Sequence, residues 1–199
     1  MSTTIKREIT RADIMPMEQY ARERAAFRQN MVALKRCRRF EVGPFAMFYF
    51  ENYQTMWHQV HEMLFIERGG EAQIEDELRA YNPLIPKGNE LVATVMFEID
   101  DPVRRARTLA RLGGVERHMF MTVGGEQIRG VPEGDVERTK ADGKTSSVHF
   151  MHFPFTPAQI EMFRTSGTQV IVGIDHPEYS HMAVMPEVTR AALVEDFAT

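Results

Sequence analysis

Four of the seven histidines lie within residues 145–185, where their spacing could bring imidazole rings together. Residues 169–175 and 181–185 are short apolar runs typical of strands. Residues 177–180 form a four-residue connection of a length that hairpins use. We therefore expect antiparallel pairing to place His176 directly opposite His181. The Cβ atoms of such a pair lie roughly 4.5–5.5 Å apart, so both rings could bind one metal ion.

Further ligands for this site would come from neighbouring strands. His149 and His152 lie on a strand expected over residues 148–155. They point to opposite faces of a regular strand, so only one could join unless a bulge intervenes. Imidazole with carboxylate suits Zn, Fe or Mn, and the sequence does not choose among these metals. The predicted metal ligands are His176, His181, His149, His152, Asp175 and Glu51.

A structural interpretation of the same histidines stands beside the metal site. Histidine at a strand end or hairpin mouth commonly hydrogen-bonds to loop backbone or to a carboxylate. Asp175 and Glu178 are available partners in the hairpin. A second pair, His58 and His61, shares a helix with Glu62, but the order H-x-x-H-E differs from the spacings that zinc peptidases use. A helix with one flank near solvent is the simpler reading of that pair.

Composition and charge limit the classes of function. The chain of 199 residues is 43% hydrophobic and carries a formal charge of −4, which argues against a nucleic-acid-binding protein. We expect the basic clusters 35–39 and 104–107 to be a helix end and a solvated helix face. Cys37 is the only cysteine, which excludes an intramolecular disulfide. Neither a signal peptide nor an apolar run long enough for the membrane is recognisable, so we expect a cytoplasmic protein.

The first 88 residues are expected to be mainly helical. Apolar residues recur at helical spacing from Pro16 to about Arg38, and Gly43-Pro44 interrupts the chain. A short strand is expected near residues 48–50. Two further helices are expected, from Asn52 to Gly69-Gly70 and over residues 71–81.

The remainder, residues 89–199, reads as two units with the same order of elements. Residues 90–132 and 147–186 each predict a strand, a helix and a hairpin. Asp101-Pro102 and Thr156-Pro157 open the two helices, the second with a capping box that Gln159 completes. We therefore predict an α+β fold within a single domain, 1–199. The two units would build an antiparallel sheet with helices on one face, and the N-terminal helical segment would cover it.

Several segments together resemble a bacterial family defined only as a domain of unknown function. They are ITRADIMPMEQYARER, FYFENYQTMW, AYNPLIPKGNELVATVMFEIDDPVRRARTLARLGG, DGKTSSVHFMHFPFTPAQI and VGIDHPEYSHMAVMP. Genes of that family often lie near genes for rubrerythrin-like di-iron proteins and iron–sulfur oxidoreductases. The resemblance thus implies a role in iron- or peroxide-related redox metabolism, but it supplies no catalytic residues. In related chains other residues can occupy the positions of His58 and His61, which favours the strand and hairpin histidines as ligands.

Two functions of different classes follow from these observations. The first is a metal-binding protein for Fe, Zn or Mn, acting as an oxidoreductase or hydrolase in which the metal polarises substrate or activates water. The second is a non-catalytic adaptor that docks onto a rubrerythrin-like or iron–sulfur redox partner. Its contact patch would be the aromatic segment 45–57, if exposed. A small-ligand binder using Lys87, Lys144 and the glycine-rich turns is a third reading, and a homodimer is a further expectation.

Overall fold

The computed structural model describes residues 5–134 and 144–198. The N-terminal part contains three long helices and a β-hairpin. The helices are α1 (Met17–Arg36), α2 (Tyr53–Glu67) and α3 (Glu71–Tyr81), and the strands β1 (Arg39–Val42) and β2 (Ala46–Phe50) lie between α1 and α2. Short 3₁₀ helices occupy Arg11–Asp13 and Asn82–Leu84.

The second part contains the two units that the sequence predicts. The first unit comprises β3 (Glu90–Phe97), α4 (Pro102–Arg111), β4 (Met119–Val123) and β5 (Glu126–Arg129), followed by the two-residue strand β6 (Val131–Pro132). The second comprises β7 (Val148–Pro154), α5 (Pro157–Arg164), β8 (Val170–His176) and β9 (Tyr179–Val184). Helix α6 (Glu187–Leu193) and two 3₁₀ helices, Val115–His118 and Val194–Asp196, complete the described elements.

Local capping explains where several helices begin. The Asn52 side chain accepts a hydrogen bond from the Thr55 amide, so α2 starts directly after Asn52. Asp101 caps α4 in the same way, and the following proline suits the first helical turn. Thr156 and Gln159 form the expected capping box of α5.

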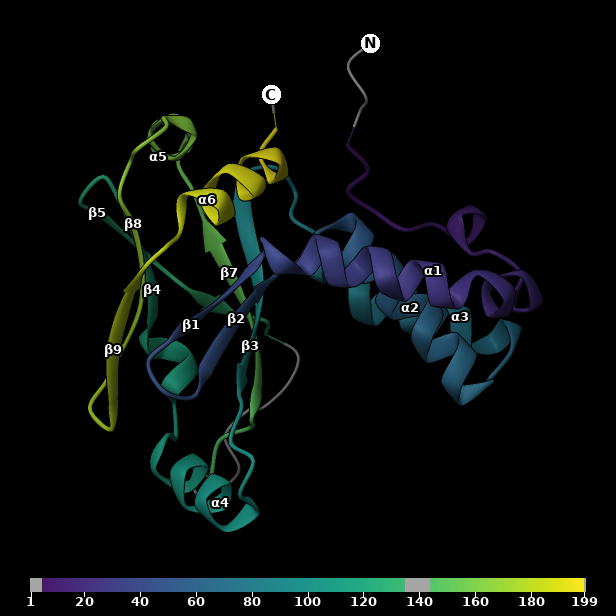
Figure 1. The fold of residues 1–199 in the computed structure, drawn as a ribbon, viewed down its shortest axis with the longest axis horizontal. Coiled ribbons are helices and arrows are strands. Elements are labelled where there is room, and N and C mark those ends of the chain that lie inside the picture. The colour runs from purple at the N-terminus through teal and green to yellow at the C-terminus, as the bar shows by residue number, and fades with distance from the viewer. Residues whose placement is uncertain (1–4, 135–143, 199) are drawn as a thin grey trace.

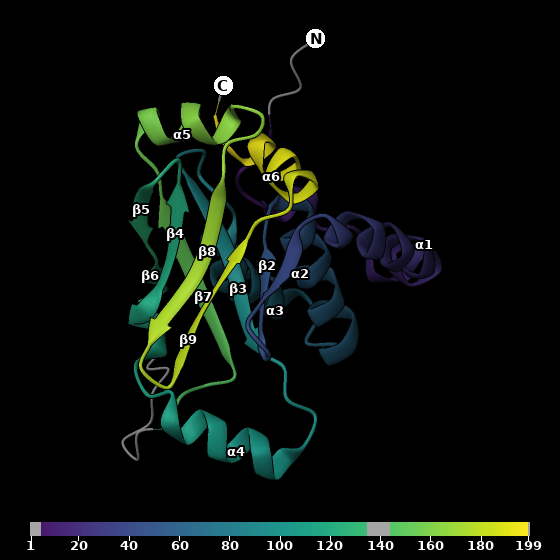
Figure 2. The same cartoon turned by 60° about the vertical axis from the view of Figure 1, so that its left-hand side comes forward.

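The α+β class and the antiparallel pairing are confirmed, but the strands divide between two sheets. One sheet has the order β1-β2-β3-β7-β6 and the other β5-β4-β8-β9. Figures 1 and 2 show the two sheets facing each other, with α4 beyond one end and α5 and α6 beyond the other. The helices therefore do not cover one face of a single sheet.

The two units interlock through their equivalent strands. Strand β3 pairs antiparallel with β7, and β4 pairs antiparallel with β8. Antiparallel pairing of equivalent elements is the relation that a two-fold axis between the units would produce. The repeated order of elements thus has a structural consequence, because each sheet takes strands from both units.

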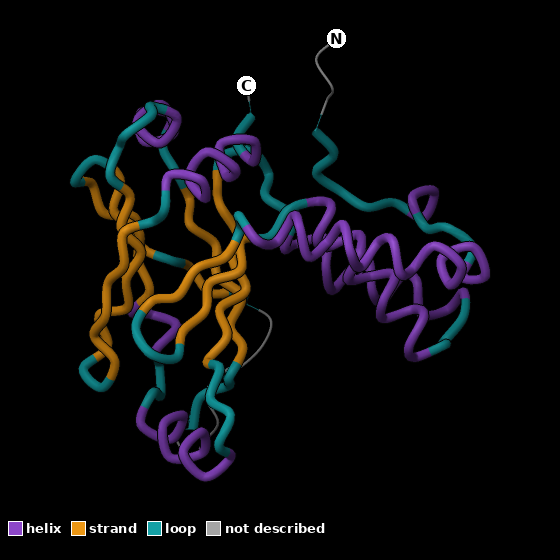
Figure 3. Tube along the Cα trace, viewed as in Figure 1, coloured by secondary structure: helices purple, strands orange, loops and turns teal. Residues whose placement is uncertain are grey.

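Two apolar clusters hold these layers together. The larger lies between the sheets and includes fully buried side chains from both, among them Phe48 and Phe153 of the first sheet and Val172 of the second. The smaller joins the helices to the outer face of the first sheet, where Val92 packs with Val60 and Leu64 of α2. Helices α1–α3, here called the helical arm, extend away from the sheets (Figure 3). None of the helices in the described ranges is both long and apolar enough to cross a membrane.

Candidate functional site

The β8–β9 hairpin is tighter than the sequence predicts. His176 pairs with Tyr179, and His181 pairs with Ile174, so only Pro177 and Glu178 connect the strands. The predicted register, with His176 opposite His181, is therefore wrong. The reason is the burial of Tyr179, which is 4% exposed and extends β9 by two residues toward the turn.

His176 is held by backbone groups on both sides of its ring. Its Nδ1 atom accepts a hydrogen bond from the Glu178 amide at 3.2 Å. Its Nε2 atom lies 3.3 Å from the Gly113 carbonyl oxygen, which only an N–H can satisfy. The side chain is buried and stands edge-on to His118, with ring centroids 5.0 Å apart. These contacts match the structural interpretation of His176, because both ring nitrogens are occupied.

His181 and Asp175 face different neighbours. The exposed His181 ring lies 4.6 Å from the Tyr179 ring, and its Cγ atom would be 2.5 Å from a Cβ atom placed on Gly43. Asp175 contacts His118 at 3.0 Å and Arg129 at 2.7 Å. The hydrogen bond from Arg129 is the main cause that lowers the pKa of Asp175. The three predicted ligands of the hairpin therefore contact different neighbours and do not form one site.

The two histidines of β7 point to opposite faces, as the strand period predicts. His149 is fully buried, with Nε2 2.9 Å from the Ser146 carbonyl oxygen and its ring edge-on to Phe97. The Glu116 carboxylate lies 4.0 Å from Nδ1 of His149. His149 is therefore a member of the buried interior.

His152 has carboxylates at both ring nitrogens. Nδ1 lies 2.9 Å from Glu90 Oε2, and Nε2 lies 2.8 Å from Glu133 Oε2; we call these three residues the His152 cluster. The hydrogen bond to Glu90 raises the pKa of His152 against the opposing effect of burial. Burial acts to raise the pKa of Glu90, but the hydrogen bond and charge of His152 together with those of Lys87 outweigh it, and the pKa is lowered. The cluster therefore favours an imidazolium between two carboxylates.

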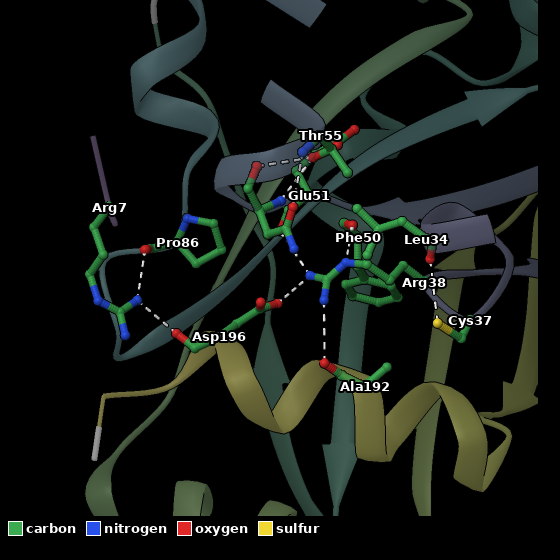
Figure 4. Close-up of polar contacts among 11 residues, drawn as sticks. Arg7, Leu34, Cys37, Arg38, Phe50, Glu51, Thr55, Pro86, Ala192 and Asp196 are labelled. Atoms are coloured by element: carbon green, nitrogen blue, oxygen red, sulfur yellow. Dashed lines mark hydrogen bonds and ion pairs between the residues drawn. The ribbon is translucent and has the colours of Figure 1, made fainter. Parts of the chain in front are cut away.

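Glu51 belongs to a different buried network, shown in Figure 4. Its Oε1 atom accepts a hydrogen bond of 2.7 Å from Thr94, and its Oε2 atom has no hydrogen-bond partner in the part of the chain described. Arg38 donates to the backbone carbonyls of Phe50 and Glu51, and it forms an ion pair with Asp196. Burial raises the pKa of Asp196 to about 6, although Arg38 acts to lower it. The network joins the end of α1 to β2 and to the C-terminal helices.

These positions bear directly on the predicted metal site. Across residues 5–134 and 144–198, no three side chains of His, Cys, Asp or Glu are arranged to hold a metal ion. The six predicted ligands are divided among the hairpin, the two faces of β7 and the network around Arg38. The helix pair offers no substitute, because both ring nitrogens of His61 contact backbone atoms, of Met15 and Trp57. Metal binding stays a prediction that rests on residue types.

The helical arm carries a feature that the histidine pattern does not reveal. A groove of about 370 Å³, here called the α1/α2 groove, lies between the two helices. Strand residues Phe48 and Phe50 of the expected aromatic patch are buried in the core, so the patch is not exposed as a whole. The residues that line the groove are Phe27, Asn30, Met31, Leu34, Tyr53, Gln54, Trp57 and His58.

The aromatic walls of this groove are ordered by packing. Phe27 of α1 stands edge-on to Trp57 of α2, with ring centroids 5.2 Å apart. The Trp57 indole N–H donates to the Asp13 carbonyl oxygen at 2.9 Å, which fixes the ring. Burial lowers the pKa of His58, so this imidazole is neutral near pH 7. The groove therefore presents a preformed, largely uncharged surface.

Comparisons with known proteins agree with the family resemblance. The family model described as "Protein of unknown function (DUF3501)" matches residues 8–197. A solved structure, described as a novel protein of unknown function from Burkholderia pseudomallei K96243, is 34% identical and superposes with a TM-score of 0.88. The match covers 96% of this chain and 99% of that one. A search of curated proteins gave no match. The chain therefore belongs to the DUF3501 family of proteins of unknown function.

Proposed function

We propose that this protein is a non-catalytic adaptor that docks onto a partner protein through the α1/α2 groove. The observation that carries the proposal is an apolar groove with ordered aromatic walls on an arm that projects from the sheets (Figure 3). Trp, Tyr and Met are enriched at the cores of protein interfaces, and Tyr53, Trp57 and Met31 line this groove. An apolar side chain of a partner would fill it.

Charges around the groove indicate the chemistry of that partner. Arg28 and Lys35 of α1 lie close enough to His58 to contribute to its lowered pKa, whereas Arg24 is already paired with Glu62. A partner segment with an apolar anchor and flanking acidic residues would complement this surface. The family resemblance suggests a rubrerythrin-like or iron–sulfur protein as the partner, and the adaptor would then serve iron- or peroxide-related redox metabolism.

The first prediction concerns the apolar wall contributed by α1. Met31→Glu places a charge in the groove and repels an acidic partner, so we expect binding to weaken at least about tenfold. The measurement is calorimetric titration with the purified rubrerythrin-like and iron–sulfur proteins of the same organism. Val32→Glu is the matched control, because Val32 is the next residue of α1 and is 74% exposed.

The outcomes separate clearly. Tight binding by wild type and the Val32→Glu variant, with weak binding by the Met31→Glu variant, supports docking in the groove. Equal affinities for the two variants, or no binding of wild type to either partner, would remove the proposal.

Metal binding is the other candidate function, and His152 is the predicted ligand with carboxylates beside it. The imidazole ring stands between Glu90 and Glu133, so the three donors do not converge on one point. Elemental analysis of protein purified without added metal tests this candidate, and metal well below one equivalent would count against it.

A further inference from the structure

Helix α4 and the β8–β9 turn lie at the opposite end of the sheets from α5 and α6 (Figure 2). A second groove lies between α4 and this turn. It has a volume of about 450 Å³, and we call it the arginine groove. Helix α4 contributes Arg104, Arg107 and Arg111, while Phe45 and Tyr179 come from the β1–β2 connection and from β9. It is separate from the α1/α2 groove on the helical arm.

The helical period explains why these arginines share one groove. Residues three and four apart lie on the same face of a helix, so Arg104, Arg107 and Arg111 follow one side of α4. Leu109 is buried and anchors the helix from another direction. The basic cluster that the sequence suggests to be a solvated face therefore borders a concave surface.

Two of the three guanidinium groups have no acidic partner in the described part of the chain. Arg111 forms an ion pair with Glu178 at the rim. The Arg104 guanidinium lies over the Phe45 ring, 4.7 Å from its centroid, and no carboxylate binds it among described residues. Arg107 forms neither a hydrogen bond nor an ion pair with any described residue.

The two acidic residues of the groove offset only part of the charge of its three arginines. The Asp101 carboxylate accepts a 2.6 Å hydrogen bond from the Arg104 amide and so caps α4. Glu178 is already paired with Arg111. The groove thus keeps an excess of positive charge in a chain whose formal net charge is −4.

The aromatic wall of the groove is rigid. The Tyr179 hydroxyl accepts hydrogen bonds of 2.9 Å from the amides of Phe45 and Ala46. It also donates to the Val42 carbonyl oxygen at 2.8 Å. The Phe45 and Tyr179 rings lie 6.2 Å apart. Because its hydroxyl is fully used and its side chain is buried, Tyr179 holds the backbone of Phe45 in place and offers the groove no hydrogen bond.

We propose that the arginine groove binds a small organic anion with a carboxylate or phosphate group attached to an aromatic or other flat apolar body. Guanidinium groups bind such anions through paired, charge-assisted hydrogen bonds. The half-buried Phe45 ring would contact the apolar body, and the volume suits a ligand of small-molecule size. The site does not depend on docking at the helical arm.

The test uses phenyl phosphate, benzoate and inorganic phosphate as probes with the full-length protein. We expect saturable binding of phenyl phosphate or benzoate by calorimetry, and a preference between them assigns the anionic group. Arg107→Gln should weaken binding at least about fivefold through the loss of charge-assisted hydrogen bonds. The fold should be unaffected, since Arg107 has no described partner to lose. Arg22→Gln on α1 is the matched control, because Arg22 is exposed and its loss changes the net charge equally.

Three results would overturn the proposal. The first is no saturable binding of either organic probe at millimolar concentration. The second is equal affinity in the Arg107→Gln and Arg22→Gln variants, which would indicate a nonspecific charge effect. The third is equal affinity for inorganic phosphate and phenyl phosphate, which would show that the groove does not recognise an apolar body.

Discussion

Single residues show how the same side chain type takes different roles in this protein. His176 uses both ring nitrogens on backbone groups, His149 is enclosed in the interior, and His152 lies between two carboxylates. Only the last arrangement favours the charged imidazolium, because opposite charge beside a titratable group stabilises its charged form. The His152 cluster links β3, β7 and the residue after β6, so its protonation state should influence stability.

The prediction at this scale is a pH dependence of unfolding. The pKa of His152 is raised from 6.5 in the folded protein. Its contribution to folding stability is therefore fully present below pH 6.5 and is lost as pH rises through the folded-state pKa. The pKa of Glu90 is lowered from 4.5, so its contribution is present above pH 4.5. The cluster should therefore stabilise the fold most between these limits. The His152→Gln variant should have a free energy of unfolding about 1–3 kcal/mol lower than wild type in this pH range, and the difference should be smaller at pH 8. Urea unfolding measures both values. An equal loss at pH 5.5 and pH 8 would contradict this origin.

At the scale of elements, the connection between β1 and β2 in one sheet packs against β9 of the other sheet. Gly43 joins β1 to β2 with φ of +70°, and the His181 ring of β9 lies directly against it. A side chain at this position would meet both a left-handed backbone and an aromatic ring. The Tyr179 hydroxyl ties the same connection to β9, so the turn and the hairpin form one unit of packing.

Gly43→Ala should therefore destabilise the protein for two separable reasons. The left-handed backbone alone costs about 1–2 kcal/mol for a residue with a Cβ atom. Contact with the His181 ring adds to this cost. In an His181→Ala background the ring contacts are lost and only the contact with the residue 181 Cβ atom, at 2.8 Å, remains, so the same change should cost less. Thermal unfolding of the four proteins of the cycle measures the difference. If the effects of the two substitutions on stability are additive, the His181 ring moves aside without an energetic cost.

At the scale of the whole molecule, one buried arginine joins segments far apart in the chain. Arg38 and Asp196 are separated by 158 residues, and both are almost fully buried (Figure 4). Arg38 also donates to carbonyl oxygens at the end of β2 and to that of Ala192 in α6. The helical arm, the first sheet and the C-terminus thus meet at one guanidinium.

Arg38→Met should destabilise the fold by about 3–5 kcal/mol near pH 8, because it leaves a buried carboxylate without its partner. The pKa of Asp196 is raised from 3.8 to about 6 even with Arg38 present, so loss of the arginine should raise it further. A carboxyl group whose pKa is raised on folding costs stability as pH rises from the unfolded value of 3.8 to the raised value, and the cost is complete above it. The destabilisation measured by urea unfolding should therefore be smaller at pH 5. Arg39→Met, at the exposed neighbouring position, is the control and should change stability little.

Local sequence signals predicted the elements and their order. Asn52, Asp101-Pro102 and the Thr156–Gln159 capping box mark helix starts through contacts within three residues, so no distant partner is needed to recognise them. The same reasoning predicted that His149 and His152 point to opposite faces, since strand geometry alone determines it.

Contacts between distant segments determined what the sequence pattern missed. The register of β8–β9 depends on Tyr179, whose hydroxyl bonds to backbone groups more than 130 residues away. Two-sheet pairing, the placement of Glu51 beside Arg38 and the arginine groove likewise depend on which segments meet after folding. Side chain types therefore indicated the available chemistry, whereas long-range packing determined which of those groups became neighbours.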